Sequence, residues 1–164
     1  MTGPERAALT KALATGREHV LRQLEGLSDD QLRTPVAPSG WTPVGLVRHL
    51  TLSDERYWFH VVIDGQPLDF WPEGHNADWS VSIAEPIEAV VAAYREAILT
   101  SDAIIAATDL DQPPASPEPW WDEAGMTFPD LRSVLIHVVV ETNVHAGQLD
   151  LVRELLDGRQ HLVL

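Results

Sequence analysis

Apolar residues recur every three to four positions in four stretches of the chain, and this spacing predicts four long helices. The first stretch runs from about Pro4 to Glu25. The second begins at Thr42–Pro43, where threonine can cap a helix and proline suits its first turn, and ends before "DGQP" at 64–67. The third runs from about Glu85 to Thr108, and the fourth from about Asp130 to Gly158, a residue typical of helix ends. No stretch alternates as a strand does, so we expect an all-α fold.

Four helices of this length in one small chain are most economically arranged as a four-helix bundle. The chain has 164 residues, which is enough for a single domain over 1–164. The second and third helices are each followed by a loop of about twenty residues, at 65–84 and 109–129. These loops are longer than most helix connections and rich in aromatic residues or proline, so we expect them to serve the function.

Charge and composition argue against several functional classes of protein. The 25 acidic and 11 basic residues give a net charge of −14, which argues against nucleic acid and anionic membranes as partners. Cysteine is absent, so disulfides, thiolate ligands and a cysteine nucleophile are excluded. No window approaches the roughly 18 apolar residues of a membrane span, and the first residues lack the apolar core of a secretory signal. We therefore expect a cytoplasmic protein.

The fourth helix carries the most informative stretch, "HVVVETNVHAGQLDLVRE" at 137–154. Its valines predict that most of the helix is covered; they are Val134, Val138, Val139, Val140 and Val144. A carboxylate in such surroundings is costly unless it is paired, protonated or bound to a metal ion. Glu141 is therefore a candidate metal ligand.

Helix geometry limits how this stretch could bind an ion. His137, Glu141 and His145 are four residues apart and share one face, but the ends of the row lie about 12 Å apart along the axis. An adjacent pair could share one ion, with a further ligand from another helix. His49 follows Leu46 on the inward stripe of the second helix and would complete a His₂Glu set with open positions. The alternative is a hydrogen-bonded His–Glu contact in the core.

Three segments resemble the DinB-like superfamily of metal-binding four-helix bundles: "GWTPVGLVRHL", "LTLSDERYWFHVVIDG" and "HVVVETNVHAGQLDLVRELLDG". The closer resemblance is to its mini-circle branch, which is related to the metal-binding domains of mycothiol-dependent maleylpyruvate isomerases. The resemblance implies one ligand from the second helix and two, four residues apart, from the fourth. These fall on His49, Glu141 and His145. Zinc is the metal most often implied, with nickel or another first-row ion as alternatives.

The resemblance also implies a chemistry. The metal would bind mycothiol or a similar small thiol, stabilise its thiolate and direct it at an electrophile, as in a transferase or isomerase. Two alternatives are a metal-dependent hydrolase and a non-catalytic, metal-stabilised binding or stress-response module. Superfamily members often form homodimers, so a homodimer is a further expectation.

Three more residues are candidates for supporting or substrate-binding roles. Arg56 follows His49 by seven residues, which in an α-helix places it on nearly the same face. It could clamp a carboxylate of a ligand, or pair with a neighbouring acidic residue. His137 is expected to be an interior histidine or to support the ligands, and Gln148, one turn after His145, could orient a ligand or a bound water.

Overall fold

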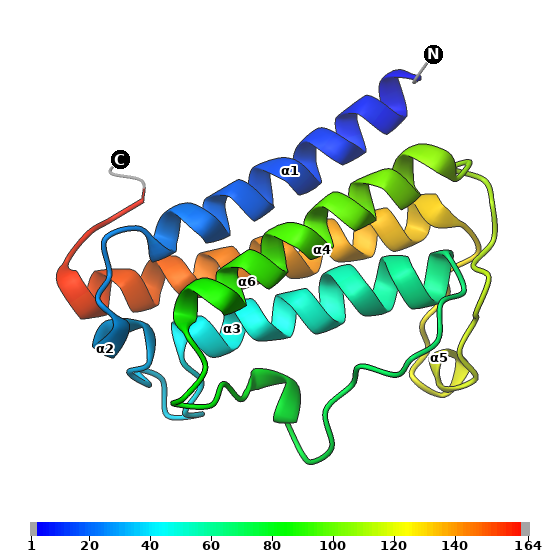
Figure 1. Ribbon diagram of the computed structural model, residues 1–164. Helices are drawn as coiled ribbons and strands as arrows, with labels where there is room; N and C mark the ends of the chain where they lie inside the picture. Colours follow the sequence, from blue (N-terminus) through cyan, green and yellow to red (C-terminus); the bar gives the residue numbers. More distant parts are fainter. Residues whose placement is uncertain (1–2, 162–164) are drawn as a thin grey trace.

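The computed structural model describes residues 3–161, which form a bundle of four helical rods (Figure 1). The rods are α1 (Pro4–Leu24), α3 (Pro43–His49) continued by the π-helix η1 (Leu50–Ile63), α4 (Ile87–Ala107) and α6 (Leu131–Asp157). Three short elements lie in the connections: α2 (Asp29–Leu32), the 3₁₀ helix η2 (Ala77–Trp79) and α5 (Trp120–Glu123). No strand occurs within residues 3–161, so the predicted all-α bundle is confirmed.

The helix ends follow from local hydrogen bonds. The Thr42 hydroxyl accepts a bond of 3.1 Å from the Gly45 N–H, and Pro43 occupies the first turn. At the start of α6 the Asp130 carboxylate accepts a bond of 2.8 Å from the Ser133 N–H. Gly158 ends α6 with a φ of 77°, a left-handed conformation that glycine adopts without steric strain.

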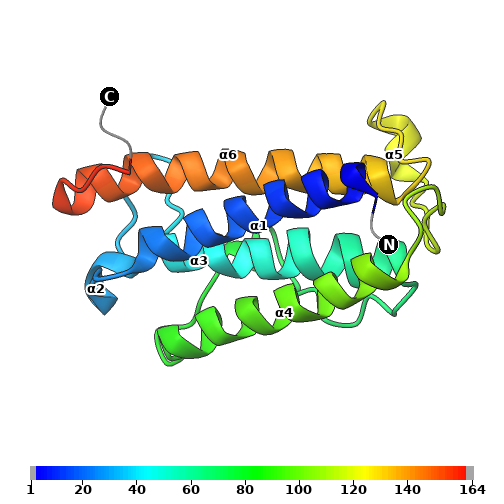
Figure 2. The same cartoon turned by 90° about the horizontal axis from the view of Figure 1, so that it is seen from above.

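The rods run alongside one another and share a core (Figure 2). The most extensive contacts join α1 to α6 and η1 to α4. Leu46, Phe59, Tyr94 and Leu135 come from three different rods and are all fully buried, so the core extends across the bundle. Among the described residues no helix is both long and apolar enough to cross a membrane.

A buried ion pair ties three of the rods together. The Arg17 guanidinium on α1 donates two hydrogen bonds of 2.7 and 2.6 Å to the Glu55 carboxylate on η1. A third bond of 2.7 Å reaches Asp102 on α4. Burial raises the pKa of Glu55, while the charge of Arg17 opposes that shift. Glu55 is fully buried, so its charge depends on this one partner.

The winding of η1 changes which side chains share a face. The Asp64 N–H donates to the Phe59 carbonyl at 3.0 Å, a bond that spans five residues instead of the four of an α-helix. Each turn therefore holds more than four residues. The side chains that line one side with His49 are Ser53, Tyr57 and Trp58. Those that line the pocket on the α4 side are Thr51, Arg56 and His60.

The exposure of α6 differs from the prediction. Val134 and Val138 are buried as expected, but Val140 and Val144 are 53% and 52% exposed and the Glu141 side chain is 43% exposed, so the expected cover of these three residues is wrong. α6 packs on α1 and η1 with one side only, and the described residues leave its other side open. The carboxylates of Asp54 and Glu55, on η1, are far more deeply buried than that of Glu141.

Candidate active site

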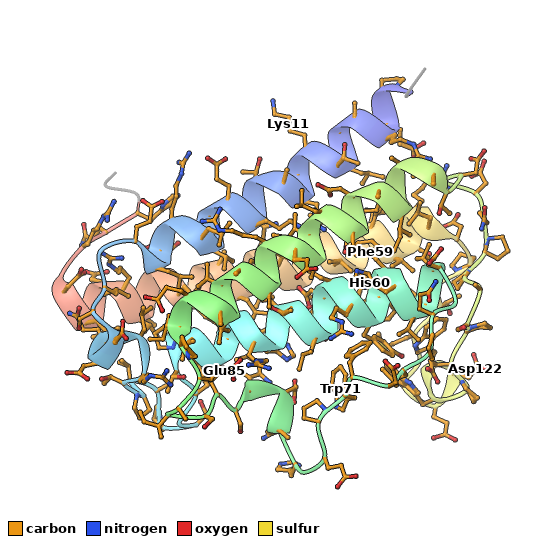
Figure 3. The ribbon with its side chains drawn as sticks, viewed as in Figure 1. Lys11, Phe59, His60, Trp71, Glu85 and Asp122 are labelled. Carbon is orange, nitrogen blue, oxygen red and sulfur yellow. The ribbon has the colours of Figure 1, made fainter. Side chains whose placement is uncertain are left out.

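A pocket of about 480 Å³ lies between η1, α6 and the two long loops. Its apolar wall contains Tyr57 and Trp58 from η1, Leu68 and Trp71 from the first loop, and Trp120 and Met126 from the second. Its polar residues are His49, Ser53, His137 and Glu141. Figure 3 shows Trp71 on the loop that runs along the side of η1 away from α4. Such a pocket suits a small molecule with an apolar body and one polar end.

His49 is held in place by the first long loop. Its Nδ1 lies 2.6 Å from Oδ2 of Asp78 in η2, a carboxylate that is itself buried. The ring stacks on the indole of Trp79, with centroids 4.1 Å apart and planes 16° apart. The Asp78 carboxylate favours the tautomer with the proton on Nδ1, which leaves Nε2 able to accept a proton or bind a metal ion.

A glycine allows η2 to approach this closely. A Cβ atom on Gly45, in the first turn of α3, would lie 2.4 Å from the Trp79 carbonyl oxygen. That distance is well inside van der Waals contact, so any side chain there would push the loop away. Gly45 therefore lets the loop bring Asp78 and Trp79 to His49.

His145 approaches His49 from the opposite rod. The ring centroids are 5.1 Å apart with the planes at 77°, and His145 is only 8% exposed. Its Nδ1 lies 2.9 Å from Oε1 of Gln148, so Gln148 contacts the candidate ligand His145. Both imidazoles are thus held at Nδ1 by a polar side chain.

Glu141, the third candidate ligand, is held less firmly than the two imidazoles. Its Oε2 lies 3.9 Å from Nε2 of His145, on the same face of α6. The donor set of two imidazoles and a carboxylate, with each imidazole fixed at Nδ1, fits a divalent first-row ion. Within residues 3–161, however, the donor atoms of His49, Glu141 and His145 are not all within 4.8 Å of one another. The three side chains that meet this distance are His19, Asp150 and His161. Glu141 would have to turn toward the histidines, and its half-exposed side chain leaves room for that.

The chain can now be compared with known proteins. The family described as mycothiol-S-transferase matches residues 8–158, which is nearly the whole chain. The chain belongs to this family. No curated protein matches the chain significantly. The match supports the small-thiol chemistry expected from the sequence, and it extends over all four rods and both long loops.

Arg56 lies outside the pocket of this mycothiol S-transferase family member. Because η1 winds by more than four residues per turn, Arg56 does not line the pocket that contains His49, and the α-helical prediction of a shared face is wrong. Its guanidinium sits 3.8 Å from the centre of the Phe70 ring. In Figure 3, His60 lies on this same side of the rod, toward α4.

His137 is in the pocket wall, one turn before Glu141. Its ring packs on Trp58 and Phe128, with centroids 4.5 and 5.1 Å away. Burial lowers the pKa of His137, and the charge of Glu141 opposes this only in part. Burial likewise lowers the pKa of His49, although its hydrogen bond to the Asp78 carboxylate opposes this shift. Both rings are therefore neutral at physiological pH, the form that accepts protons or binds metal.

The sequence reasoning missed Asp54, which lies directly behind the site. This carboxylate is 1% exposed and accepts a hydrogen bond of 2.9 Å from the hydroxyl of Thr142, the residue after Glu141. Burial raises the pKa of Asp54 well above its ordinary value, and the nearby Glu55 and Glu141 charges add to the shift. No periodicity signals this contact, because it joins two rods whose register the sequence does not give.

Proposed function

We propose that this chain is a metal-dependent transferase that joins the sulfur of mycothiol to an electrophile. The observation that carries the proposal is the meeting of His49 and His145, each fixed at Nδ1, at a pocket with an aromatic wall. The mycothiol S-transferase family match supplies the thiol. The proposed metal ligands are His49, Glu141 and His145.

A divalent ion bound by these residues would supply a Lewis acid that favours the thiolate form of a small thiol. The chain's own residues do the remaining work. The aromatic wall of Tyr57, Trp58 and Trp71 holds the apolar body of the electrophile and excludes water from it. Neutral His137 faces the same pocket, and we assign it as the acceptor of the thiol proton.

The bond changes balance without an oxidant. The thiol loses its proton, the sulfur lone pair forms a bond to the electrophilic carbon, and the bond from that carbon to its leaving group breaks. With a chlorinated electrophile the leaving group departs as chloride. With an epoxide the ring oxygen remains attached and takes up a proton. The chain lacks cysteine, so the only thiol in this reaction is the one the cosubstrate brings.

We propose zinc as the metal, because a His₂Glu set with open positions is a common catalytic zinc arrangement. Nickel binds the same donors and is the second candidate. The direct test is elemental analysis of protein purified without chelators. We expect close to one equivalent of metal at this site, lost in a Glu141→Ala/His145→Ala variant. Protein that carries no metal under these conditions contradicts the proposal.

The reaction has its own test. Metal-loaded protein is mixed with mycothiol and a chlorinated electrophile, and thiol consumption is followed together with formation of the thioether. Electrophile breakdown that proceeds equally without thiol would instead indicate a metal-dependent hydrolase. Bound metal with neither reaction would indicate a non-catalytic binding module. The cytoplasmic location expected from the sequence stays a prediction.

We further propose that a second copy of the chain covers an apolar stripe on α6. The stripe is spaced by four, four, seven and four residues, which places it on one helix face: Ile136, Val140, Val144, Leu151 and Leu155, each 49–64% exposed. Its exposed neighbours Asn143 and Gln148 are uncharged, and Glu154 lies beside its C-terminal end. Two copies that each carry a charge of −14 repel, so a contact between them needs a mainly apolar surface such as this.

The homodimer is tested by light scattering after gel filtration. We expect a dimer at micromolar concentration, and a monomer for Val144→Glu. Leu99→Glu changes an apolar residue on α4 that is even more exposed than Val144, and it should leave the dimer intact. A monomeric native protein at 100-fold higher concentration rules the dimer out.

A further inference from the structure

Three side chains from separate segments meet near one end of the bundle. His19 lies on α1, Asp150 on α6, and His161 follows the end of α6. Nε2 of His19 is 2.6 Å from Oδ1 of Asp150, and the rings of His19 and His161 stack with centroids 3.7 Å apart and planes at 20°. One donor atom from each residue lies within 4.8 Å of the others. We call these residues the C-terminal cluster.

We propose that the C-terminal cluster is a second divalent-metal site, of the zinc type. Two imidazole nitrogens and one carboxylate oxygen are donors that zinc commonly uses, and they lie within 4.8 Å of one another, so small movements of the side chains would bring them around a single ion. The fourth position would be filled by water. The site is separate from the one at His49.

The geometry favours an ion over an isolated ion pair. Asp150 is a single carboxylate facing two imidazoles, and only His19 is within hydrogen-bond distance of it. A cation between the three donors would satisfy both rings at once. His19 and Asp150 are partly buried, so neighbouring atoms hold their side chains in position. His161 is exposed, so its ring can turn toward the ion.

The two proposed sites use different faces of α6. Asp150 follows His145 by five residues, which turns it about 140° around the helix axis. His145 therefore faces α3, while Asp150 faces α1. A metal at the C-terminal cluster would not touch the pocket. It would fasten the segment after Gly158 to α1, which makes it a structural clip.

The test measures zinc binding to the full chain, stripped with a chelator and then titrated with Zn²⁺. We expect one equivalent more for the native chain than for His161→Ala or Asp150→Asn, and at least a tenfold loss of affinity for that equivalent. His161 is exposed, so its replacement removes a ligand without disturbing the core. His75→Ala, another exposed histidine, should keep the full number of equivalents.

A second measurement tests whether zinc fastens the segment after Gly158 to α1. Trypsin cleaves after Arg159, which lies between the end of α6 and His161. Zn²⁺ should slow this cleavage about tenfold in the native chain and in Glu141→Ala, but not in His161→Ala. The Glu141→Ala variant separates this site from the one at His49, because it removes a ligand of the latter only. Equal zinc stoichiometry in the native chain and His161→Ala, or cleavage unaffected by Zn²⁺, would overturn the proposal.

Discussion

Asp78 and His49 are 29 positions apart in the chain, yet Oδ2 of the one lies 2.6 Å from Nδ1 of the other. The contact fixes the tautomer and orientation of a proposed metal ligand. It also explains why a long loop returns to the bundle at this point. Its removal is therefore the most direct probe of how the site is held together.

Asp78→Asn should lower metal affinity about 10- to 100-fold while the fold is retained, because the amide orients the imidazole less strongly than the carboxylate does. Affinity is measured by competition with a chromophoric chelator. Asp69→Asn, an exposed change in the same loop, is the control and should have no effect. Unchanged affinity in Asp78→Asn would mean that His49 needs no such support.

Gly45→Ala should weaken metal binding to a similar degree, although alanine favours a helix. The added Cβ would lie 2.4 Å from the Trp79 carbonyl oxygen and so push the loop, with Asp78, away from His49. Gly147→Ala is the matched control, because a Cβ there meets no atom within 4 Å. It should stabilise α6 by about 1 kcal/mol and leave metal affinity unchanged. Equal affinity in the two variants would exclude this role for Gly45.

Trp71→Ala should raise the KM of an apolar electrophile about tenfold, the effect of losing about 1.4 kcal/mol of apolar contact. Trp71 lines the pocket and is 40% exposed, so its loss should not unfold the bundle. Arg56→Ala should change kcat/KM less than twofold, because Arg56 does not line the pocket. A large effect of Arg56→Ala with a native fold would contradict the assignment of faces.

Arg17→Met should destabilise the fold by about 3–5 kcal/mol in urea unfolding, because it leaves the fully buried Glu55 charge without a partner. The double variant Arg17→Met/Glu55→Met should recover most of that loss. Arg22→Met removes an exposed pair with Glu18 and should cost less than about 0.5 kcal/mol. A double variant as unstable as the single one would show that lost packing, and not the lone charge, is responsible.

Stability should fall with rising pH through the titration of Asp54. Its pKa is raised in the folded chain, so between about 3.8 and the raised value the folded state holds a proton that the unfolded state has released. Metal-free Asp54→Asn should therefore be more stable than the native chain at pH 8 in urea unfolding, because the native chain must either keep or lose a proton from a buried carboxyl. The difference should shrink as pH falls toward 4. Asp109→Asn, an exposed change, is the control, and a pH-independent difference for Asp54→Asn would refute this assignment.

The fold was predictable where local chemistry decides it. Thr42 and Pro43 mark the start of one rod, and Asp130 and Gly158 mark the ends of another, because caps depend on a few neighbouring residues. The four rods therefore fall within two residues of their predicted bounds. The sequence also placed His49 and His145 on facing helices, and their rings lie 5.1 Å apart between centroids.

The predictions that failed concern helix winding and side-chain exposure, which the spacing of apolar residues does not determine. A π-helix and an α-helix bury similar apolar residues, so periodicity over 50–63 did not reveal the wider winding, and Arg56 was placed on the wrong face. Val140 and Val144 were expected to be covered because they are apolar, yet apolar residues also occur on exposed faces. The Asp78 contact depends on how a twenty-residue loop folds back, and sequence spacing carries no such distance.

The half-exposed position of Glu141 bears on how fast ligands can exchange. Both imidazoles of the proposed site are locked by neighbours, so the carboxylate is the part free to move. A side chain at the surface changes rotamer within picoseconds to nanoseconds, whereas shifting a packed helix takes microseconds or longer. An ion or a thiol could therefore enter and leave through the swing of one side chain, without any opening of the bundle.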